Sequence, residues 1–226
     1  MKDLITIGLP SKGRLKEKSI SFFNDRGLKI IQSEKERNYF GTIENKPNVK
    51  IIFLHAKEII QRLGDGTLDI GVSGLDLLKE SDKNLQSKIN IQKKLDYGNA
   101  NLVVAVPDDW IDVQTIADLE EISFDMRSKR NARLRVATKY PNLTNDFLIS
   151  KGVTQYKLIP SLGATETYPF IGSSEIITDI TSTGKTLVDN NLRVLKDGMI
   201  LSSRACLFIA KKKAAKLQPF LKSLGR

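Results

Sequence analysis

The sequence predicts an α/β protein with largely parallel sheets, covered by helices and divided into two lobes. Three observations lead to this prediction. Short apolar runs and amphipathic helical segments alternate along the whole 226-residue chain. Several apolar runs are nearly continuous, which is typical of strands buried on both faces. Strong strand patterns begin again near Gly98 with no linker-like segment before them, and this restart marks the expected boundary between the lobes.

The first half opens with an apolar run at 4–9, closed by Pro10, which indicates a buried strand. Residues 15–23 mix apolar and charged side chains as an amphipathic helix does, and Gly27 is suited to end that helix. Further strands are expected at 49–54 and 68–74, and further helices at 56–63 and 75–80.

The second half repeats the alternation, beginning with a strand at 102–106 that Pro107 ends. Helices are expected at 112–119, 142–150 and 211–224, and strands at 135–138, 156–160, 175–180 and 201–210. Repeated β-α-β units imply open sheets, whose ligands bind beyond the carboxyl ends of the strands. Candidate site residues are therefore sought just after the strands.

Composition indicates an ordinary globular protein, with 40% hydrophobic and 27% charged residues. The single cysteine, Cys206, excludes an internal disulfide. The N-terminus does not have the pattern of a signal peptide, and no apolar stretch approaches the length of a membrane span. A cytoplasmic protein with no membrane partner is expected.

The formal net charge of +10 favours polyanionic partners: nucleic acid, anionic membrane or phosphorylated small molecules. Solvated surface lysines are the alternative explanation. Basic residues cluster only at 127–135 and 211–213, and neither cluster has interleaved aromatic residues for stacking on bases. No nucleic-acid partner is therefore expected.

The segment 178–187 has the pattern of an anion-binding turn. An apolar strand ends in Asp179, and hydroxyl residues around Gly184 precede a helix start. Backbone N–H groups and hydroxyls in such a turn can donate to a phosphate, while Asp179 can accept hydrogen bonds from a sugar. Gly184 would let the backbone approach the ligand closely. An ordinary polar turn is the alternative; a P-loop is rejected, because Asp179 stands where that motif requires glycine.

Residues 166–187 resemble the diagnostic motif of the ATP phosphoribosyltransferases. Every fixed position is met: Glu166, Gly172, Ser174, Ile177, Asp179, Ile180, Thr183, Gly184, Thr186 and Leu187. Segments 9–15, 69–76 and 135–142 resemble the N-terminal loop, glycine turn and central strand of the family. The resemblance thus spans nearly the whole chain, and it is to the short-form catalytic subunit.

The resemblance implies a periplasmic-binding-protein type II-like fold with a central cleft. The first lobe would comprise residues 1–97 together with 188–226, where the chain returns to it. The second lobe, 98–187, would carry the loop that binds phosphoribosyl pyrophosphate (PRPP). The implied reaction condenses N1 of the adenine of ATP with PRPP, giving N1-(5-phosphoribosyl)-ATP and pyrophosphate in the first step of histidine biosynthesis. Mg²⁺ acts with both substrates. The implied partner is a regulatory subunit resembling histidyl-tRNA synthetase, in a hetero-oligomer built from homodimers.

The resemblance also assigns residues, although it leaves the metal ligands open. The PRPP site comprises Asp179, Thr181, Ser182, Thr183, Gly184, Lys185, Thr186 and Leu187. Lys12 and Arg14 are the expected catalytic residues, contacting pyrophosphate or the phosphates of ATP. Further ATP contacts are expected from Ser11, Gly13, Glu166, Asp69, Gly71 and Gly74.

Structural roles are open for several of these residues. Lys12 can be a solvated loop lysine, Glu166 can serve a helix N-terminus, and Asp69 can bond nearby backbone. Arg135 and Lys139 lie either near the ligand or on the surface. His55 is more simply a surface or interlobe residue, and Cys206 a core residue.

The alternative function is a non-catalytic small-anion-binding module with the fold of solute-binding proteins. The hydroxyl-rich turn after Asp179 favours the enzyme, because a sensor of neutral ligands would not need it.

Overall fold

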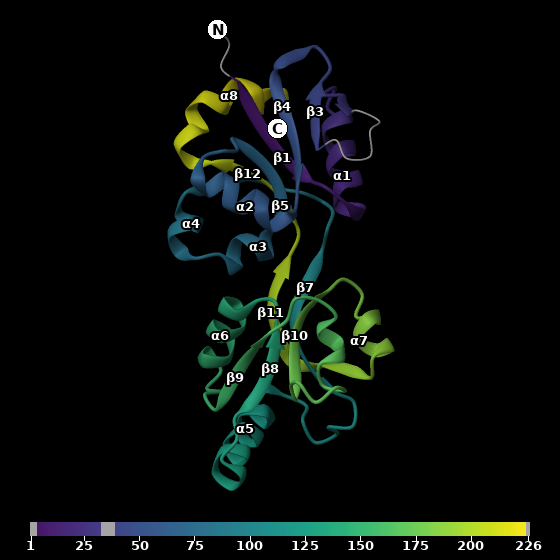
Figure 1. Cartoon of the computed structure of the whole chain (residues 1–226), viewed down its shortest axis with the longest axis vertical. Coiled ribbons are helices and arrows are strands. Elements are labelled where there is room, and N and C mark those ends of the chain that lie inside the picture. Colours follow the sequence, from purple (N-terminus) through teal and green to yellow (C-terminus); the bar gives the residue numbers. More distant parts are fainter. Residues whose placement is uncertain (1–3, 33–38, 225–226) are drawn as a thin grey trace. The chain divides into compact units, whose positions relative to one another are not determined.

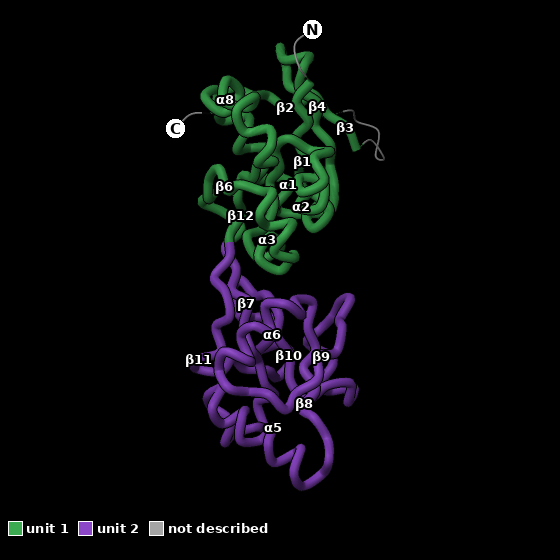
Figure 2. The backbone as a smooth tube through the Cα atoms, turned by 90° about the vertical axis from the view of Figure 1, so that its left-hand side faces the viewer, with its two compact units in different colours: residues 1–98, 204–226 green, residues 99–203 purple. Residues whose placement is uncertain are grey.

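A computed structural model describes residues 4–32 and 39–224. The chain forms two compact units, residues 1–98 with 204–226 and residues 99–203, which Figure 2 colours green and purple. The first unit contains a seven-stranded sheet and the second a five-stranded sheet. Each unit buries its own apolar residues.

The first unit has strand order β2-β3-β4-β1-β5-β12-β6 (Figure 1). Its strands are β1 (Ile5–Pro10), β2 (Ile30–Gln32), β3 (Phe40–Ile43), β4 (Lys46–Leu54), β5 (Ile70–Gly74), β6 (Ile89–Lys94) and β12 (Ala205–Ala210). Its helices are α1 (Gly13–Asn24), α2 (Ala56–Asp65), α3 (Leu75–Glu80), α4 (Lys83–Ser87), the 3₁₀ turn η2 (Lys211–Lys213) and α8 (Ala214–Ser223). Because β1 is parallel to β4 and β5, these three strands end at one edge of the sheet.

Apolar layers cover both faces of this sheet. Helices α1 and α8 pack on one face, and α2 and α3 on the other. Successive side chains of strand β12 point to opposite faces. Leu207 packs in the layer of α1 and α8, and Cys206 and Phe208 pack in the layer of α2 and α3. Cys206 is fully buried, and burial raises the pKa of its thiol. The interpretation of Cys206 as a core residue is confirmed.

The second unit has strand order β11-β7-β10-β8-β9. Its strands are β7 (Ala100–Pro107), β8 (Leu134–Thr138), β9 (Tyr156–Pro160), β10 (Ile176–Thr181) and β11 (Leu192–Ser203). Its helices are α5 (Ile116–Arg130), α6 (Pro141–Ser150), the 3₁₀ turn η1 (Thr165–Thr167) and α7 (Lys185–Asp189). Strands β8, β9 and β10 are mutually parallel, so they also share one carboxyl edge.

The chain returns to the first unit at Arg204, later than the residue 188 expected from the sequence. The reason is β11, which pairs antiparallel with β7 along most of its length and so remains in the second unit. The apolar run at 201–210, expected as one strand, is divided by Arg204 into the end of β11 and all of β12.

Helix α5 begins later than expected and is longer. It starts at Ile116 rather than 112, because Thr115 and Asp118 form a capping box there. It ends at Asn131, which adopts the left-handed conformation with φ 51°. In the part of the chain that the structure describes, none of the helices has the length and hydrophobicity needed to cross a membrane.

Candidate functional site

The carboxyl edge of β8 and β10 brings several predicted site residues together. Asp179 lies near the end of β10, and Lys139 directly follows β8, with 3.9 Å between Lys139 Nζ and Asp179 Oδ2. Thr165 of η1 hydrogen-bonds to the same carboxylate, and neighbouring Glu166 adds its negative charge. The Asp179 side chain is only 13% exposed. The edge therefore holds a mostly buried carboxylate beside one lysine.

Burial is the main influence on the pKa of Asp179 and raises it above its ordinary value. Lys139 opposes this shift, as does the backbone N–H of Ile180, which donates to Asp179 Oδ1 at 2.8 Å. Glu166 acts in the same direction as burial. The ionised form of Asp179 is thus incompletely compensated, and hydrogen-bond donors from a ligand would stabilise it.

A buried cluster of threonine hydroxyls lies beneath this pair. Thr178 Oγ1 is 2.6 Å from Thr138 Oγ1 and 2.7 Å from Thr144 Oγ1 of α6. Thr138 and Thr178 immediately precede Lys139 and Asp179, so the hydroxyls tie β8 to β10 just below the site. All three threonines are buried. Sequence reasoning missed this cluster, because the three residues share no local pattern.

The turn after β10 is closed by its own hydroxyls. Thr181 Oγ1 accepts from the Gly184 N–H at 2.9 Å, and Thr183 Oγ1 accepts from the Lys185 N–H at 3.3 Å. Gly184 has φ 76°, and a Cβ there would meet no atom within 4 Å. Its backbone conformation therefore requires glycine, which is a different reason from the close approach expected from the sequence.

The side chains of this turn divide by exposure. Those on the solvent side are Ser182, Thr183, Lys185 and Thr186. Leu187 is only 3% exposed and packs with Ala137 and Ile177, so its side chain anchors the turn in the apolar core. The exposed hydroxyls and Lys185 are the groups that can reach an anion.

In the first unit, the expected catalytic residues lie just past β1. The Ser11 N–H donates to Leu54 O at 2.9 Å, which joins the ends of β1 and β4. Lys12 is the N-cap of α1, and Gly13 has φ 70°. Lys12 and Arg14 are exposed, and neither forms an ion pair within the described ranges. Both cations are available to a phosphorylated ligand.

Asp69 lies at the other edge of the same sheet, before β5. Its Oδ2 accepts from the Thr6 N–H at 2.7 Å, and its Oδ1 lies 2.7 Å from Lys213 Nζ. Burial opposes ionisation of Asp69, but Lys213 and Thr6 outweigh it and hold its pKa below the usual value. The structure therefore gives Asp69 a structural role and does not bring it together with Ser11, Gly13 and Arg14.

The two predicted glycines of β5 are explained by packing. A Cβ on Gly71 would lie 2.5 Å from Ile59 Cγ2, so glycine allows α2 to approach the sheet. A Cβ on Gly74 would lie 2.2 Å from Asp76 Oδ1, which folds back over the turn into α3. Gly74 is on the same carboxyl edge as Ser11, whereas Gly71 is inside the buried strand.

Two further candidates have local structural partners. His55 is the N-cap of α2, where its Nδ1 accepts from the Lys57 N–H at 3.3 Å. Arg135 lies at the amino end of β8, paired with Glu175 at 2.5 Å, so it is separated from Lys139 by the length of that strand.

Comparison with known proteins identifies the family. The sequence profile of the ATP phosphoribosyltransferases matches residues 55–225. An ATP phosphoribosyltransferase from Brucella melitensis is 46% identical over 209 residues, covering 92% of this chain and 90% of that protein. The chain belongs to the ATP phosphoribosyltransferase family. It is accordingly a glycosyltransferase of the first step of histidine biosynthesis, and the predicted function is confirmed.

Solved structures agree with this ATP phosphoribosyltransferase assignment. The structure titled ATP phosphoribosyl transferase (HisG:HisZ) complex from Thermotoga maritima matches with a TM-score of 0.74 and 26% identity, over 98% of this chain and 96% of that chain. This match indicates the short form. A probable amino-acid ABC transporter extracellular-binding protein from Bacillus subtilis matches with a TM-score of 0.52 and 14% identity, over 99% of this chain and 92% of that one. That likeness concerns the fold alone, and it confirms the predicted α/β fold class. The expectation of largely parallel sheets is wrong: both sheets are mixed, because β3, β6, β7, β11 and β12 pair antiparallel with their neighbours.

Proposed function

We propose that this chain is the catalytic subunit that joins N1 of ATP to the anomeric carbon of PRPP and releases pyrophosphate. The observation that carries the proposal is Asp179, a mostly buried and incompletely paired carboxylate at the end of β10, followed directly by an exposed hydroxyl-rich turn. A ribose 5-phosphate group needs this combination, because it offers hydroxyl donors at one end and phosphate acceptors at the other.

The turn 181–187 is proposed to hold the 5′-phosphate of PRPP. Ser182, Thr183 and Thr186 are exposed and can donate from their hydroxyls, and Lys185 adds a positive charge. Asp179 would accept hydrogen bonds from the ribose hydroxyls, which would offset the cost of burying its charge. Gly184 and Leu187 are proposed to shape and anchor the turn rather than contact the sugar through side chains.

The exposed cations after β1 are proposed to act on the leaving group. Adenine N1 is a weak nucleophile, so the reaction depends on alignment of N1 with the anomeric carbon and on neutralising the departing pyrophosphate. Lys12 and Arg14 supply that charge, with Ser11 and Gly13 at the start of the same helix. Glu166, beside Asp179, is proposed to contact the nucleotide. No ATP contact is proposed for Asp69 or Gly71, whose surroundings are structural.

Mg²⁺ is proposed to arrive with the two substrates. The described residues contain no group of three or more His, Cys, Asp or Glu side chains able to hold a metal ion. Mg²⁺ is usually bound through one or two carboxylates together with substrate phosphates. Asp179 and Glu166 are the carboxylates at the carboxyl edge of the second sheet. When bound, the ion would neutralise charge on the leaving pyrophosphate.

The partner proposed for this chain is a regulatory subunit resembling histidyl-tRNA synthetase. The Thermotoga maritima relative was solved as a HisG:HisZ complex. We infer a similar hetero-oligomer here, with a homodimer of this chain as its building unit, acting in the cytoplasm.

The test is release of pyrophosphate from ATP, PRPP and Mg²⁺, with and without the regulatory subunit of the same organism. Release that requires both substrates is expected, and it should increase when the regulatory subunit is added. PRPP binding without pyrophosphate release under either condition would contradict the proposal and favour the non-catalytic binding module.

A further inference from the structure

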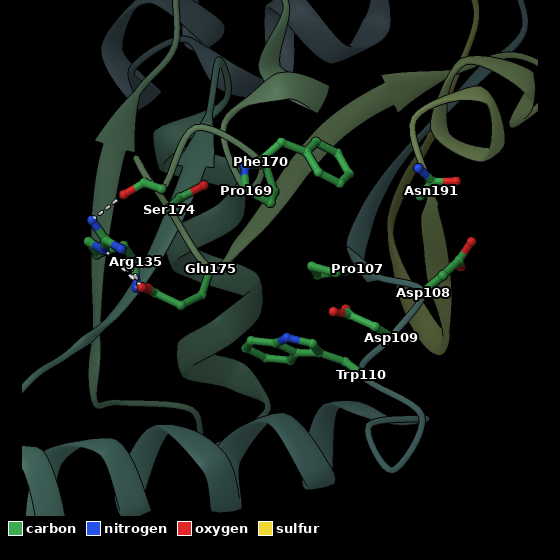
Figure 3. A pocket seen from close by; sticks show the side chains of 11 residues that line it. Pro107, Asp108, Asp109, Trp110, Arg135, Pro169, Phe170, Ser174, Glu175 and Asn191 are labelled. Carbon is green, nitrogen blue, oxygen red and sulfur yellow. Dashed lines mark hydrogen bonds and ion pairs between the residues drawn. The ribbon is translucent and has the colours of Figure 1, made fainter.

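The second unit contains a cavity of about 600 Å³ that is separate from the turn 181–187. It is formed by the end of β7, the segment 108–110, the start of β8, the segment before β10, and Asn191 (Figure 3). These segments lie at the amino end of β10, whereas the turn follows its carboxyl end. None of residues 181–187 lines the cavity. Its volume is in the range of small-molecule sites.

Flat apolar groups line much of this cavity. The indole of Trp110 and the ring of Phe170 both border it, together with Pro107 and Pro169 (Figure 3). Phe170 is 54% exposed, so its ring is open to a ligand from solvent. Aromatic faces attract planar ligands and cations.

The unpaired charge of the cavity is negative. Arg135 is the only cation among its lining residues, and the carboxylate of Glu175 neutralises it through contacts at Nε and Nη2. Asp108 and Asp109 are exposed, and neither is ion-paired in the part of the chain that the structure describes. The unpaired charge of the cavity lining is thus opposite in sign to the net charge of the chain, which is +10. Among the lining residues the charge balance favours a cation over an anion; the one further cation beside the wall, Arg193, is held by the carbonyls of Trp110 and Val113.

One buried polar atom in the cavity wall has no partner. Ser174 is 2% exposed, and its hydroxyl makes no hydrogen bond to any described residue. Ser174 lies between Arg135 and Pro169 in Figure 3. Buried hydroxyls are nearly always hydrogen-bonded, so an orphan in a cavity wall indicates a missing partner. A polar group of a bound ligand, or a water held by it, would supply that partner.

We propose that this cavity binds a small organic cation, an ammonium or guanidinium group carried on a flat aromatic body. The aromatic body packs against Trp110 and Phe170, and the charged nitrogen faces the Asp109 carboxylate, while Asp108 adds negative charge at the rim (Figure 3). The site is distinct from the PRPP turn and takes a ligand of opposite charge. A free small molecule is the occupant proposed, rather than an arginine or lysine side chain of another protein chain.

The test uses Trp110 as the reporter, because it is the only tryptophan in the sequence. Its fluorescence is followed while the intact protein is titrated with 2-phenylethylammonium, with neutral 2-phenylethanol and with anionic phenylacetate. The ammonium probe should give a saturable change and bind about tenfold more tightly than the neutral probe. Phenylacetate should bind more weakly still.

Variants of the lining residues distinguish the contribution of charge to probe binding from the contribution of the aromatic surface. Asp108→Asn combined with Asp109→Asn should weaken binding of the ammonium probe about fivefold or more and reduce its advantage over the neutral probe. The matched control, Asp112→Asn, changes an exposed aspartate of the same segment that does not line the cavity. It should leave binding unchanged. Phe170→Ala, at an exposed position, should weaken the ammonium and neutral probes alike.

Three results would overturn the proposal. The first is no saturable change in Trp110 fluorescence with the ammonium probe. The second is equal binding of the three probes, or a loss in Asp112→Asn as large as in the double variant. The third is a Trp110 signal that changes with protein concentration before any probe is added, because the cavity would then be occupied by another protein chain.

Discussion

Two cation–carboxylate pairs lie at opposite ends of strands β8 and β10, four residues apart in each segment of the chain, and one pair makes more contacts than the other. At the amino ends, Arg135 Nη2 lies 2.5 Å and Nε 3.0 Å from Glu175 Oε1. At the carboxyl ends, Lys139 Nζ is 3.9 Å from Asp179 Oδ2. The first pair forms a fork of short contacts, whereas the second is a single loose contact.

The surroundings of the two carboxylates also differ, and they compensate the charge of Glu175 better than that of Asp179. Glu175 also accepts from the Arg135 backbone N–H at 2.6 Å, and its hydrogen bonds raise the pKa of the Arg135 guanidinium. Asp179 is buried to a similar degree, but burial dominates and raises its own pKa. A complete pair holds the fold, while an incomplete pair beside an exposed turn is available to the donors of a ligand.

The largest expected effect is on PRPP affinity in Asp179→Asn. Hydrogen bonds to a charged acceptor contribute about 1.5–3 kcal/mol, so the neutral amide should weaken PRPP binding roughly 10- to 150-fold. Isothermal titration calorimetry with Mg²⁺ at pH 7 measures this. Unchanged affinity would remove Asp179 from the proposed PRPP site.

Glu175→Gln should affect stability and leave PRPP affinity intact. Because the Arg135 side chain is 40% exposed, solvent screening reduces the loss to about 1 kcal/mol, or roughly 2–4 °C in the midpoint of thermal unfolding. The control is Glu121→Gln on the exposed face of α5. A drop in PRPP affinity without a drop in stability would reverse the roles assigned to the two pairs.

A smaller effect is expected from Thr144→Val, which removes a hydroxyl beneath the Lys139–Asp179 pair. The variant loses the contacts of Thr144 Oγ1 with Thr178 Oγ1 at 2.7 Å and with Thr138 Oγ1 at 3.2 Å. If the cluster positions the pair, each lost hydrogen bond, about 0.5–1.5 kcal/mol, would weaken PRPP binding roughly two- to tenfold. Thr144→Ser should restore affinity, because it keeps the hydroxyl. Reduced thermal stability with unaltered PRPP affinity would show that the threonine cluster supports the fold only.

The smallest effect concerns stability against pH. The pKa of Asp179 is raised in the folded protein, so the native state binds its proton more readily than the unfolded chain does. The charged Asp179 therefore destabilises the folded protein fully above its folded-state pKa. This destabilisation is relieved as the pH falls from that pKa toward the ordinary aspartate pKa of 3.8. Asp179→Asn should be more stable than the parent protein at pH 7, and chemical denaturation across this pH range should show the difference narrowing toward acid. If Asp179→Asn were less stable than the parent protein at pH 7, the charged Asp179 would not destabilise the fold, and the prediction would be wrong.

The sequence predicted the elements whose signals are local. The apolar runs at 4–9 and 102–106 are strands β1 and β7, and the pattern after Asp179 is a glycine turn leading to a helix. Residues 192–200 of strand β11 were missed, because their buried residues are separated by exposed or charged ones such as Lys196 and the strand shifts register near Met199. The expected position of the chain's return was wrong for the same reason.

The features of the site that could not be predicted depend on contacts between residues far apart in the sequence. Asp69 resembled a ligand residue by its place in a family segment, yet its partners, Thr6 and Lys213, are far away in the sequence. Trp110 and Phe170 come from segments sixty residues apart, so their shared cavity has no sequence signal. Local turn chemistry could be predicted, whereas pairing between distant residues could not.

The most direct test of the central comparison is the PRPP-induced shift in the thermal unfolding midpoint, measured side by side for the parent protein, Asp179→Asn and Glu175→Gln. If Asp179 belongs to the PRPP site and Glu175 only to the fold, PRPP should raise the midpoint of the parent and of Glu175→Gln by similar amounts, and that of Asp179→Asn much less. A full shift in Asp179→Asn, or a shift lost only in Glu175→Gln, would contradict the account.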